Sequence, residues 1–299
     1  MLKVKKISIV IAVMAICSCG SQKTVTSKSK TEVQGHRGDR GNFPENSIPA
    51  FISAIKKGVD VLELDVVISK DQKVVVSHEP FMSSQYMLDL DGKPVSKEKQ
   101  KSYNLYEMTY DSIRKFDSGS RGNTAFPQQL RQKTYKPLLS EMMDDVEQYI
   151  AKNNLRPVRY NIEIKSEKSE YGISQPQPEA FVKMVMQIIK EKRMEEKINI
   201  QSFDPVVLSV MHKEYPKIKI AYLVGEGAVG KNLSQLDFKP EIYSPNYKLL
   251  NKEVVDSLRS MQIKVIPWTV NKEQDIDAMI KLKVDGIITD YPERVLRKL

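Results

Sequence analysis

Short apolar runs recur along the chain after residue 32, and most intervals between them have the periodicity of an amphipathic helix. Strands that alternate with helices predict a parallel sheet, because a parallel crossover needs a long connection that is usually helical. Eight such strands predict an α/β fold, the (β/α)8 TIM barrel. An open, doubly wound sheet has the same alternation and is the alternative. The runs are 33–38, 61–66, 160–165, 198–203, 218–225, 241–247, 264–271 and 285–290.

The helices are predicted from apolar stripes with helical spacing. Gly58 ends the first stripe, Pro178 begins the second, and Asn271 is the expected N-cap of the fourth. The interval 225–241 holds three glycines and has the weakest periodicity. The clear stripes are Ile48–Ile55, Phe181–Ile189, Val254–Met261 and Ile276–Ile280.

A further apolar run, 74–79, does not fit the alternation. It follows the second strand after only residues 69–73, a connection far too short for a parallel crossover. We therefore expect a β-hairpin that rises from the second strand. A turn centred near Asp71 would pair residues whose numbers sum to about 142, which brings His78 beside Leu64, between Glu63 and Asp65.

Residues 81–136 match no strand–helix repeat and are predicted to be an insertion on the loop after the second strand. In a TIM barrel, loops of this kind lie over the face that carries the active site. A disordered loop is the alternative, but the aromatic residues of the segment favour packing. The barrel domain, with this insertion, is expected to cover 33–299.

Two of the predicted strands carry charged pairs within apolar runs. Alternate side chains of a strand share one face, so Glu63 lies with Asp65, and Glu163 lies with Lys165. An unpaired charge is costly to bury, and convergence of three acids favours a bound cation. Carboxylate oxygens suit Ca²⁺ or Mg²⁺, whereas zinc would favour more histidine or cysteine. A structural ion pair between Lys165 and one acid is the alternative.

The chain has three histidines. His36 follows the first strand and His78 ends the hairpin, so both are expected at the barrel rim that carries the three acids. One histidine at a strand end is usually structural, but two beside three acids favour acid–base catalysis. His212 lies in a helical stretch and is expected to be an ordinary helix residue.

Several motifs resemble, in order and in spacing, those of glycerophosphodiester phosphodiesterases. They are HRG…PENS…AF, ELDV…SKD…VVVSHE, IEIK, QSF, PWTVN and GIITDYP, and they run from about residue 34 to 294. The resemblance implies a barrel of the phosphatidylinositol-phospholipase C type, a bound divalent cation, and hydrolysis of glycerophosphodiesters to glycerol 3-phosphate and an alcohol. The chain departs from the family at Glu79, where aspartate is usual, and at Ser47, where the PENS segment usually reads PENT.

The resemblance also implies roles for individual residues. These are the metal ligands Glu63, Asp65 and Glu163, the phosphate-binding Arg37 and Lys165, and the general acid and base His36 and His78. Which histidine is the base stays open. The nucleophile is either the glycerol hydroxyl of the substrate, which would give a cyclic phosphate, or water. Trp268, the single tryptophan, either walls the glycerol pocket or packs in the core.

Two other functions are compatible with these motifs. Within the same superfamily, the substrate could be a phosphoinositide or a lysophospholipid. From a different class, the chain could be a non-catalytic lipoprotein that binds phosphodiesters. Both histidines and all three acids are present, which argues against the binding protein, because binding alone needs no acid–base pair. We expect the insertion to influence which alcohol group is accepted.

Residues 1–18 have the features of a lipoprotein signal peptide. Basic residues precede the apolar run Ile7–Ile16, which is short for a membrane span. The small residue before Cys19 resembles a lipobox better than the isoleucine before Cys17, so lipidation is predicted at Cys19. An ordinary cleaved signal is the alternative. No cysteine lies beyond residue 19, so the mature fold has no internal disulfide.

Residues 19–32 are polar and lysine-rich, and are predicted to be a flexible tether. Together with the signal, the tether predicts an exported, membrane-anchored lipoprotein on the periplasmic or cell-surface face. The formal charge is +9, but the signal and tether hold much of it, so about +4 remains on the folded part. This charge is too dilute for a nucleic-acid surface and mildly favours an anionic substrate or membrane.

Overall fold

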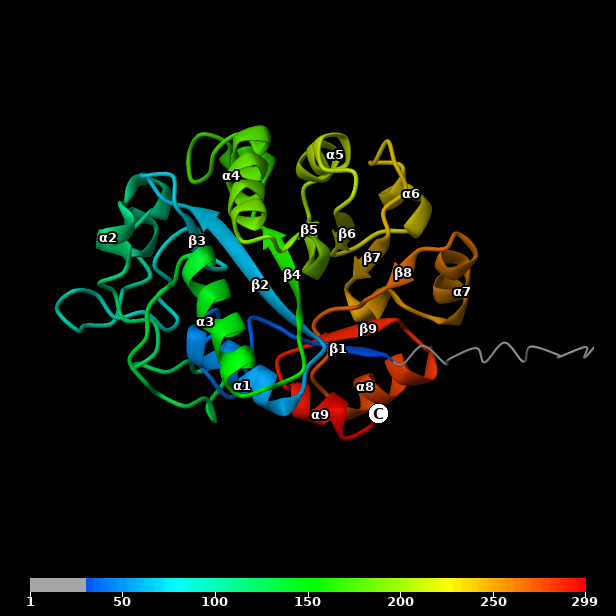
Figure 1. The fold of residues 1–299 in the computed structure, drawn as a ribbon, viewed down its shortest axis with the longest axis horizontal. Coiled ribbons are helices and arrows are strands. Elements are labelled where there is room, and N and C mark those ends of the chain that lie inside the picture. Colours follow the sequence, from blue (N-terminus) through cyan, green and yellow to red (C-terminus); the bar gives the residue numbers. More distant parts are fainter. Residues whose placement is uncertain (1–30) are drawn as a thin grey trace, which may run out of the picture.

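The computed structural model describes residues 31–299, which form a barrel of parallel strands surrounded by helices (Figure 1). The strand order is β8-β7-β6-β5-β4-β2-β1-β9. Between the outer strands, Asp285 N donates to Val265 O (2.9 Å) and Ile288 N donates to Pro267 O (3.0 Å), so the barrel is nearly closed. The strands are β1 (Glu32–Gly35), β2 (Val61–Ile68), β4 (Arg159–Ile164), β5 (Ile198–Ser202), β6 (Lys219–Val224), β7 (Ile242–Pro245), β8 (Lys264–Val265) and β9 (Gly286–Thr289).

The TIM barrel prediction is therefore confirmed, and the open doubly wound alternative is wrong. Each of the eight predicted apolar runs overlaps one parallel strand. The predicted tether and barrel boundary differs slightly from the structure, because Glu32, assigned to the tether, is the first residue of β1 and pairs with Gly286 of β9. The predicted signal peptide and the rest of the tether, to residue 30, lie outside the described residues.

Helices cover the outside of the barrel (Figure 1). The one between β6 and β7, α6, has only five residues, in the interval where the sequence has the weakest periodicity. No helix in the part of the chain that the structure describes is long and apolar enough to cross a bilayer. The helices are α1 (Ile48–Lys57), α2 (Tyr110–Ile113), α3 (Leu139–Lys152), α4 (Pro178–Glu191), α5 (Pro205–Glu214), α6 (Val229–Leu233), α7 (Lys252–Ser260), α8 (Glu273–Lys281) and α9 (Pro292–Leu296), with 3-10 turns at Gln100–Ser102, Leu105–Glu107, Lys168–Glu170, Glu195–Lys197 and Tyr247–Leu249.

The ends of two helices show where local sequence rules hold and where they fail. Helix α1 ends at Gly58, whose φ of 90° is accessible to glycine and lets its N–H bond to the carbonyl of Ile55. The predicted N-cap of α8 is wrong: the N-cap position is Lys272, without a side-chain bond. Asn271 instead binds Asp290, donating from Nδ2 to Oδ2 (2.7 Å) and accepting the Asp290 N–H at Oδ1 (2.9 Å).

The hairpin has the predicted register. Strand β3 (Val74–Val76) runs antiparallel to β2, with Val76 opposite Val66. Beyond the last paired residues, Ser77 N donates to the carbonyl of Asp65 (3.0 Å). Residue 78 is thereby held at the rim where β2 carries its acids.

The two faces of the barrel strands differ in composition. Side chains that point outward, such as Leu62, Leu64 and Ile162, join a large apolar core with the helices. Those that point inward on β1, β4 and β5 are polar: Asn161 Nδ2 donates to Gln34 Oε1 (2.9 Å) and to Gln201 Oε1 (3.0 Å). The opposite half of the interior is apolar, with a small cluster of Ala221, Ile242, Ile266 and Ile288.

The segment 81–136, which contains α2, packs beside the β2–β3 hairpin, near α3 in Figure 1. It has its own apolar cluster, which includes Met82, Met87 and Leu105, and this cluster rests on Val67 and Val75 of the hairpin. The segment is therefore packed rather than a disordered loop. It also contacts the loop after β1, where Gln129 Nε2 donates to the carbonyl of Arg40 (2.8 Å).

Candidate functional site

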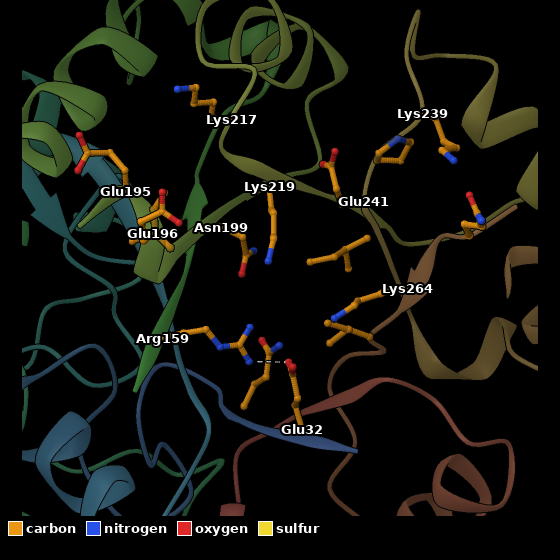
Figure 2. Close-up of a pocket in the computed structure, with 16 residues that line it drawn as sticks. Glu32, Arg159, Glu195, Glu196, Asn199, Lys217, Lys219, Lys239, Glu241 and Lys264 are labelled. Carbon is orange, nitrogen blue, oxygen red and sulfur yellow. Dashed lines mark ion pairs between the residues drawn. The ribbon is translucent and has the colours of Figure 1, made fainter. Parts of the chain in front are cut away.

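Two cavities lie at opposite ends of the barrel. The larger one, about 400 Å³, lies at the amino ends of the strands and is drawn in Figure 2. Lys219, Lys264 and the ion pair between Arg159 and Glu32 (2.8 Å) face it, so charges of both signs meet there. None of the residues that the sequence predicts for the site lines this cavity.

The second cavity, about 200 Å³, lies at the carboxyl ends of the strands, which is the active face of TIM barrels. Seven of the predicted residues line it, and Asp65 lies buried beside them. Cys19, the predicted lipidation site, lies outside the described residues. The seven are His36, Arg37, Glu63, His78, Glu163, Lys165 and Trp268.

The acidic triad, defined as Glu63, Asp65 and Glu163, is brought together by strand pairing. In the parallel pair of β2 and β4, Asp65 lies directly opposite Glu163. Glu63 is on the same inward face, two residues before Asp65. One carboxylate oxygen from each residue lies within 4.8 Å of the other two, and all three side chains are buried.

Protein donors satisfy most, but not all, of the triad's oxygens. Glu63 accepts from the backbone N–H of Arg37 (2.8 Å) and from Gln201 Nε2 (2.8 Å). Glu163 accepts from Lys165 Nζ (2.7 Å). Asp65 Oδ2 accepts from Asn46 Nδ2 (2.8 Å), but its buried Oδ1 has no hydrogen-bond donor among the described residues.

The pKa shifts show how the three charges are accommodated. Burial raises the pKa of Glu63 well above its usual range, and its neighbours Asp65 and Glu163 raise it further. Burial also raises the pKa of Glu163, although Lys165 opposes the shift. Burial alone would raise the pKa of Asp65 too, but Arg37, His78 and Lys165 together outweigh burial and hold that pKa well below its usual range.

These features fit a divalent cation. Three carboxylates of two neighbouring strands supply hard oxygen ligands, and the free Asp65 Oδ1 is a buried acceptor without a donor. The structural ion pair that was the alternative also exists, between Lys165 and Glu163, and Arg37 lies 3.3 Å from Asp65, but Glu63 has no lysine or arginine partner among the described residues. The ion pair and a cation are therefore complementary.

Each catalytic histidine candidate is bound to a carboxylate through Nδ1. The Nδ1–H of His36 donates to Asp290 Oδ1 (2.6 Å), and that of His78 donates to Glu79 Oε1 (3.1 Å). A carboxylate can only accept, so Nδ1 carries the proton and Nε2 is left for the cavity. In His36, Nε2 lies 4.0 Å from Glu63 Oε2, at the edge of the triad.

The carboxylate partners of the histidines are held ionised. Burial opposes ionisation of Asp290, but His36, together with Arg40 and Asn271, outweighs burial and lowers the pKa of Asp290 to about 2. Burial likewise opposes ionisation of Glu79, but the hydrogen bond and charge of His78, together with Lys136 and Arg37, outweigh burial and lower the pKa of Glu79 well below its usual range. In His36, burial lowers the pKa and Asp290 opposes the shift.

Arg37 joins the triad to the loop after β1. Its backbone has a φ of 50°, which is uncommon outside glycine, and this conformation directs its N–H at Glu63. Its guanidinium donates to Glu45 Oε1 (2.6 Å) and lies 3.3 Å from Asp65 Oδ2. Arg40, which also lines the cavity, donates to the other oxygen of Glu45 (2.7 Å).

Sequence reasoning missed the partners that hold the predicted residues in place. Of these, Glu45 and Asn46 are part of the PENS segment and Asp290 is part of the GIITDYP segment, so the motifs contained them without showing what they contact. Gln201 lies in the QSF segment. Their contacts join strands far apart in the chain, which local patterns do not reveal.

Trp268 forms part of an apolar wall opposite the charged residues. Its Nε1 donates to the carbonyl of Ser244 (2.8 Å), and Phe203 meets it edge to face with ring centres 5.4 Å apart. The ring packs against the interior apolar cluster and also lines the cavity. That it walls a glycerol pocket stays a prediction. The cavity thus has a polar side with the triad and histidines, and an apolar side.

Comparisons with known proteins identify the family of the chain and support its fold. The model of the glycerophosphoryl diester phosphodiesterase family matches residues 36–294. A glycerophosphodiester phosphodiesterase of Caldanaerobacter subterraneus is 32% identical over 268 residues, covering 89% of this chain and 97% of the relative. The crystal structure of a putative glycerophosphoryl diester phosphodiesterase from Silicibacter pomeroyi has a TM-score of 0.81 at 27% identity, over 90% of this chain and 93% of that one.

A more distant structure, an Oleispira antarctica phosphodiesterase in complex with the product sn-glycerol-3-phosphate, has a TM-score of 0.69 at 21% identity. The overlap covers 89% of this chain and 95% of that one. At this identity the comparison establishes the shared fold.

We predict that Ca²⁺ or Mg²⁺ stabilises the protein in a pH-dependent way. Protons on Glu63 and Glu163, whose pKa values are raised, stabilise the metal-free fold at low pH, and this stabilisation is lost as the pH rises through the raised values. A cation must displace these protons, so it binds better at higher pH. Saturating cation should raise the Tm of chelator-treated protein by roughly 5–10 °C near neutral pH, and by less near pH ~5.

Thermal unfolding with and without cation measures this effect. Asp65→Asn should remove the cation response, whereas the control Glu147→Gln, which changes a carboxylate on α3 away from the cavity, should retain it. A Tm increase that is independent of pH, or that persists in Asp65→Asn, would contradict a cation at the triad.

Proposed function

Since the chain belongs to the glycerophosphoryl diester phosphodiesterase family and is therefore a phosphoric diester hydrolase, we propose that it hydrolyses glycerophosphodiesters to glycerol 3-phosphate and an alcohol, using a divalent cation and two histidines. The observation that carries the proposal is the meeting of the acidic triad and both Nδ1-bound histidines at one cavity. Hydrolysis of a phosphodiester needs positive charge near the phosphate, a base and an acid. A cation held by the triad would supply the positive charge, and the two histidines would be the base and the acid.

Binding of the phosphate would rely on the basic residues of the cavity. Arg37, Arg40 and Lys165 all line it, from the loop after β1 and the end of β4. They are fixed by carboxylates, because Glu45 holds both arginines and Glu163 holds the lysine. Such preorganised donors stabilise charge that develops on phosphate oxygens, without having to reorient during the reaction.

Proton transfer would use the two histidines. One would take the proton of the attacking hydroxyl at Nε2, and the other would give a proton from Nε2 to the oxygen of the leaving alcohol. Asp290 and Glu79 keep the rings in the orientation that leaves Nε2 available. A cation held by the acidic triad would supply positive charge to a phosphate oxygen and lower the pKa of a bound hydroxyl.

Features of the site also bear on the two alternative functions, a protein that only binds phosphodiesters and an enzyme that cleaves lysophospholipids. A protein that only binds phosphodiesters would have no use for two ionised carboxylates that orient histidines, so the Asp290 and Glu79 contacts favour an enzyme. Cleavage of lysophospholipids is favoured by one feature, the exposed Phe203 beside the cavity, which could contact an acyl chain.

The direct test is a panel of glycerophosphodiesters and one lysophospholipid, followed by ³¹P NMR. We predict release of glycerol 3-phosphate from the glycerophosphodiesters, loss of this release with a chelator, and recovery with added Ca²⁺ or Mg²⁺. A transient cyclic phosphate would identify the glycerol hydroxyl as the nucleophile, and its absence would favour water. Binding without turnover of any substrate would reject the enzyme in favour of the binding protein.

We predict that His36→Ala and His78→Ala each lower kcat by about 10²–10⁴-fold, the usual cost of losing a general acid or base. Both proteins should remain folded, because neither ring belongs to the apolar core. Steady-state kinetics and thermal unfolding check this, with His212→Ala as the control, since His212 stacks on Phe238 away from the cavity. Near wild-type turnover of either variant would reject a catalytic role for that histidine.

We also propose that the protein is a lipoprotein anchored through Cys19. The sequence before Cys19 and the polar residues after it support this proposal. A flexible coil of about a dozen residues reaches roughly 20 Å on average. The chain enters the barrel at the amino end of β1, opposite the end that carries His36, so the active face would point away from the anchor. An active face that points away from the membrane would favour small soluble diesters as substrates.

We predict that Cys19→Ala moves the protein from the membrane fraction to the soluble fraction while its activity on soluble diesters is unchanged. The reason is that Cys19 lies far from the barrel in sequence and carries only the proposed lipid, and stable anchoring requires attached acyl chains. Cell fractionation and activity assays measure both effects, with Cys17→Ala as the matched control that stays with the membrane. Retention of Cys19→Ala in the membrane fraction would contradict the anchor.

A further inference from the structure

The segment 81–136 contributes two buried polar side chains to the residues around His78. These are Tyr86, near its beginning, and Lys136, at its end, and both are almost fully buried. Neither lines the catalytic cavity, and neither contacts the acidic triad. Their contacts are directed at Ser77 and Glu79, the residues on either side of His78.

Tyr86 holds the side chain of Glu79. Its hydroxyl donates to Glu79 Oε2 (2.8 Å), while Glu79 Oε1 accepts the Nδ1–H of His78 (3.1 Å). The carboxylate is thus fixed at both oxygens, by the insertion on one side and by the histidine on the other. Glutamate is one methylene longer than the aspartate that the family resemblance predicts here, and the Tyr86 hydroxyl restrains the longer side chain.

Lys136 holds the backbone of the same residues. Its Nζ donates to Ser77 Oγ (2.8 Å), and Ser77 Oγ in turn donates to the carbonyl of Glu79 (2.6 Å). Lys136 also donates to the Tyr86 hydroxyl (3.3 Å), so the two insertion residues form one network. Burial lowers the pKa of Lys136, and Glu79 and Glu45 oppose that shift.

We propose that Tyr86 and Lys136 are positioning residues for catalysis: they hold Glu79 against Nδ1 of His78 and thereby keep its Nε2 directed at the cavity. This role is needed because the ring of His78 is one-third exposed, whereas that of His36 is largely enclosed. The ring of His78 is less enclosed than that of His36, so its orientation depends more on the hydrogen bond to Glu79. The insertion, by this account, is part of the acid–base machinery.

The kinetic part of this proposal rests on the proposed function. If Tyr86 acts through His78, Tyr86→Phe should lower kcat by roughly 10-fold, as outer partners of functional side chains typically do, with little change in KM. In a His78→Ala background the same substitution should change kcat by less than about twofold, because the ring that it orients is gone. Lys136→Met should behave in the same way.

The chain offers a matched control pair for these variants. The Tyr160 hydroxyl donates to Glu147 (2.8 Å), and Lys197 Nζ donates to the other oxygen of the same glutamate. This reproduces the Tyr–Glu pair with a neighbouring lysine on the outside of the barrel. Tyr160→Phe and Lys197→Met should therefore leave kcat within about twofold of wild type, whatever their effect on Tm.

A spectroscopic measurement tests the geometry without any activity. Long-range ¹H–¹⁵N NMR of the three imidazoles, with the His78 signals assigned by comparison with His78→Ala, reports which nitrogen of the neutral ring carries the proton. We expect His78 to be the Nδ1–H tautomer in the wild type, and the fraction of this tautomer to fall in Tyr86→Phe.

The outcomes distinguish this proposal from the proposed function. Equal losses of kcat in the wild-type and His78→Ala backgrounds would show a general structural role and overturn it, as would wild-type kcat in both Tyr86→Phe and Lys136→Met. An Nε2–H tautomer of wild-type His78 would also overturn it, even if the protein hydrolysed no diester. Absence of diesterase activity with the expected tautomer and its loss in Tyr86→Phe would reject the proposed function and leave the positioning network supported.

Discussion

The site depends on three carboxylates buried together at one end of the barrel. Burial raises the pKa values of Glu63 and Glu163, and repulsion from the neighbouring carboxylates, which is strong where the local dielectric is low, raises them further. The surrounding residues respond to this repulsion. The strained backbone of Arg37 directs an N–H at Glu63, Asn46 and Gln201 donate further bonds, and Lys165 pairs with Glu163. A cation would complete what these donors leave unsatisfied.

Barrel topology explains how the chain assembles this cluster. Parallel neighbours place equivalent positions of β2 and β4 side by side, and the alternation of strand side chains directs the acids inward. The hairpin then returns His78 to the same rim, while closure of the barrel brings β9 beside β1 and so Asp290 to His36. The two histidines therefore obtain their carboxylate partners in different ways. Glu79 directly follows His78 in the sequence, whereas Asp290 lies beside His36 only because β9 pairs with β1.

This difference explains how much could be predicted from the sequence. Strands, the hairpin register and the convergence of the acidic triad follow from periodicity and strand parity, and the structure has all three. The partner of His36 could not be found in this way, because 254 residues separate it from Asp290. The error at Asn271 has the same origin: as an isolated residue before a helix it is a good N-cap, but tertiary contact with Asp290 uses its side chain instead.

The barrel interior is divided into a polar half and an apolar half, so the cavity at its carboxyl end has one polar wall and one apolar wall. The buried amides of Gln34, Asn161 and Gln201 lead from the amino end of the barrel up to Glu63, so the triad rests on a hydrogen-bonded support that fixes its carboxylates. Across the interior, the apolar cluster supports Trp268 at the cavity wall.

A small substrate with one charged phosphate and one uncharged glycerol would be oriented by this division, because its phosphate is best solvated beside the basic residues and its carbon skeleton beside the indole. The cavity at the opposite end is lined by both basic residues and glutamates, with apolar residues such as Ile198 and Ile242 among them, and it contains no histidine. Although that cavity is larger, only the smaller one has the asymmetry that orients a substrate.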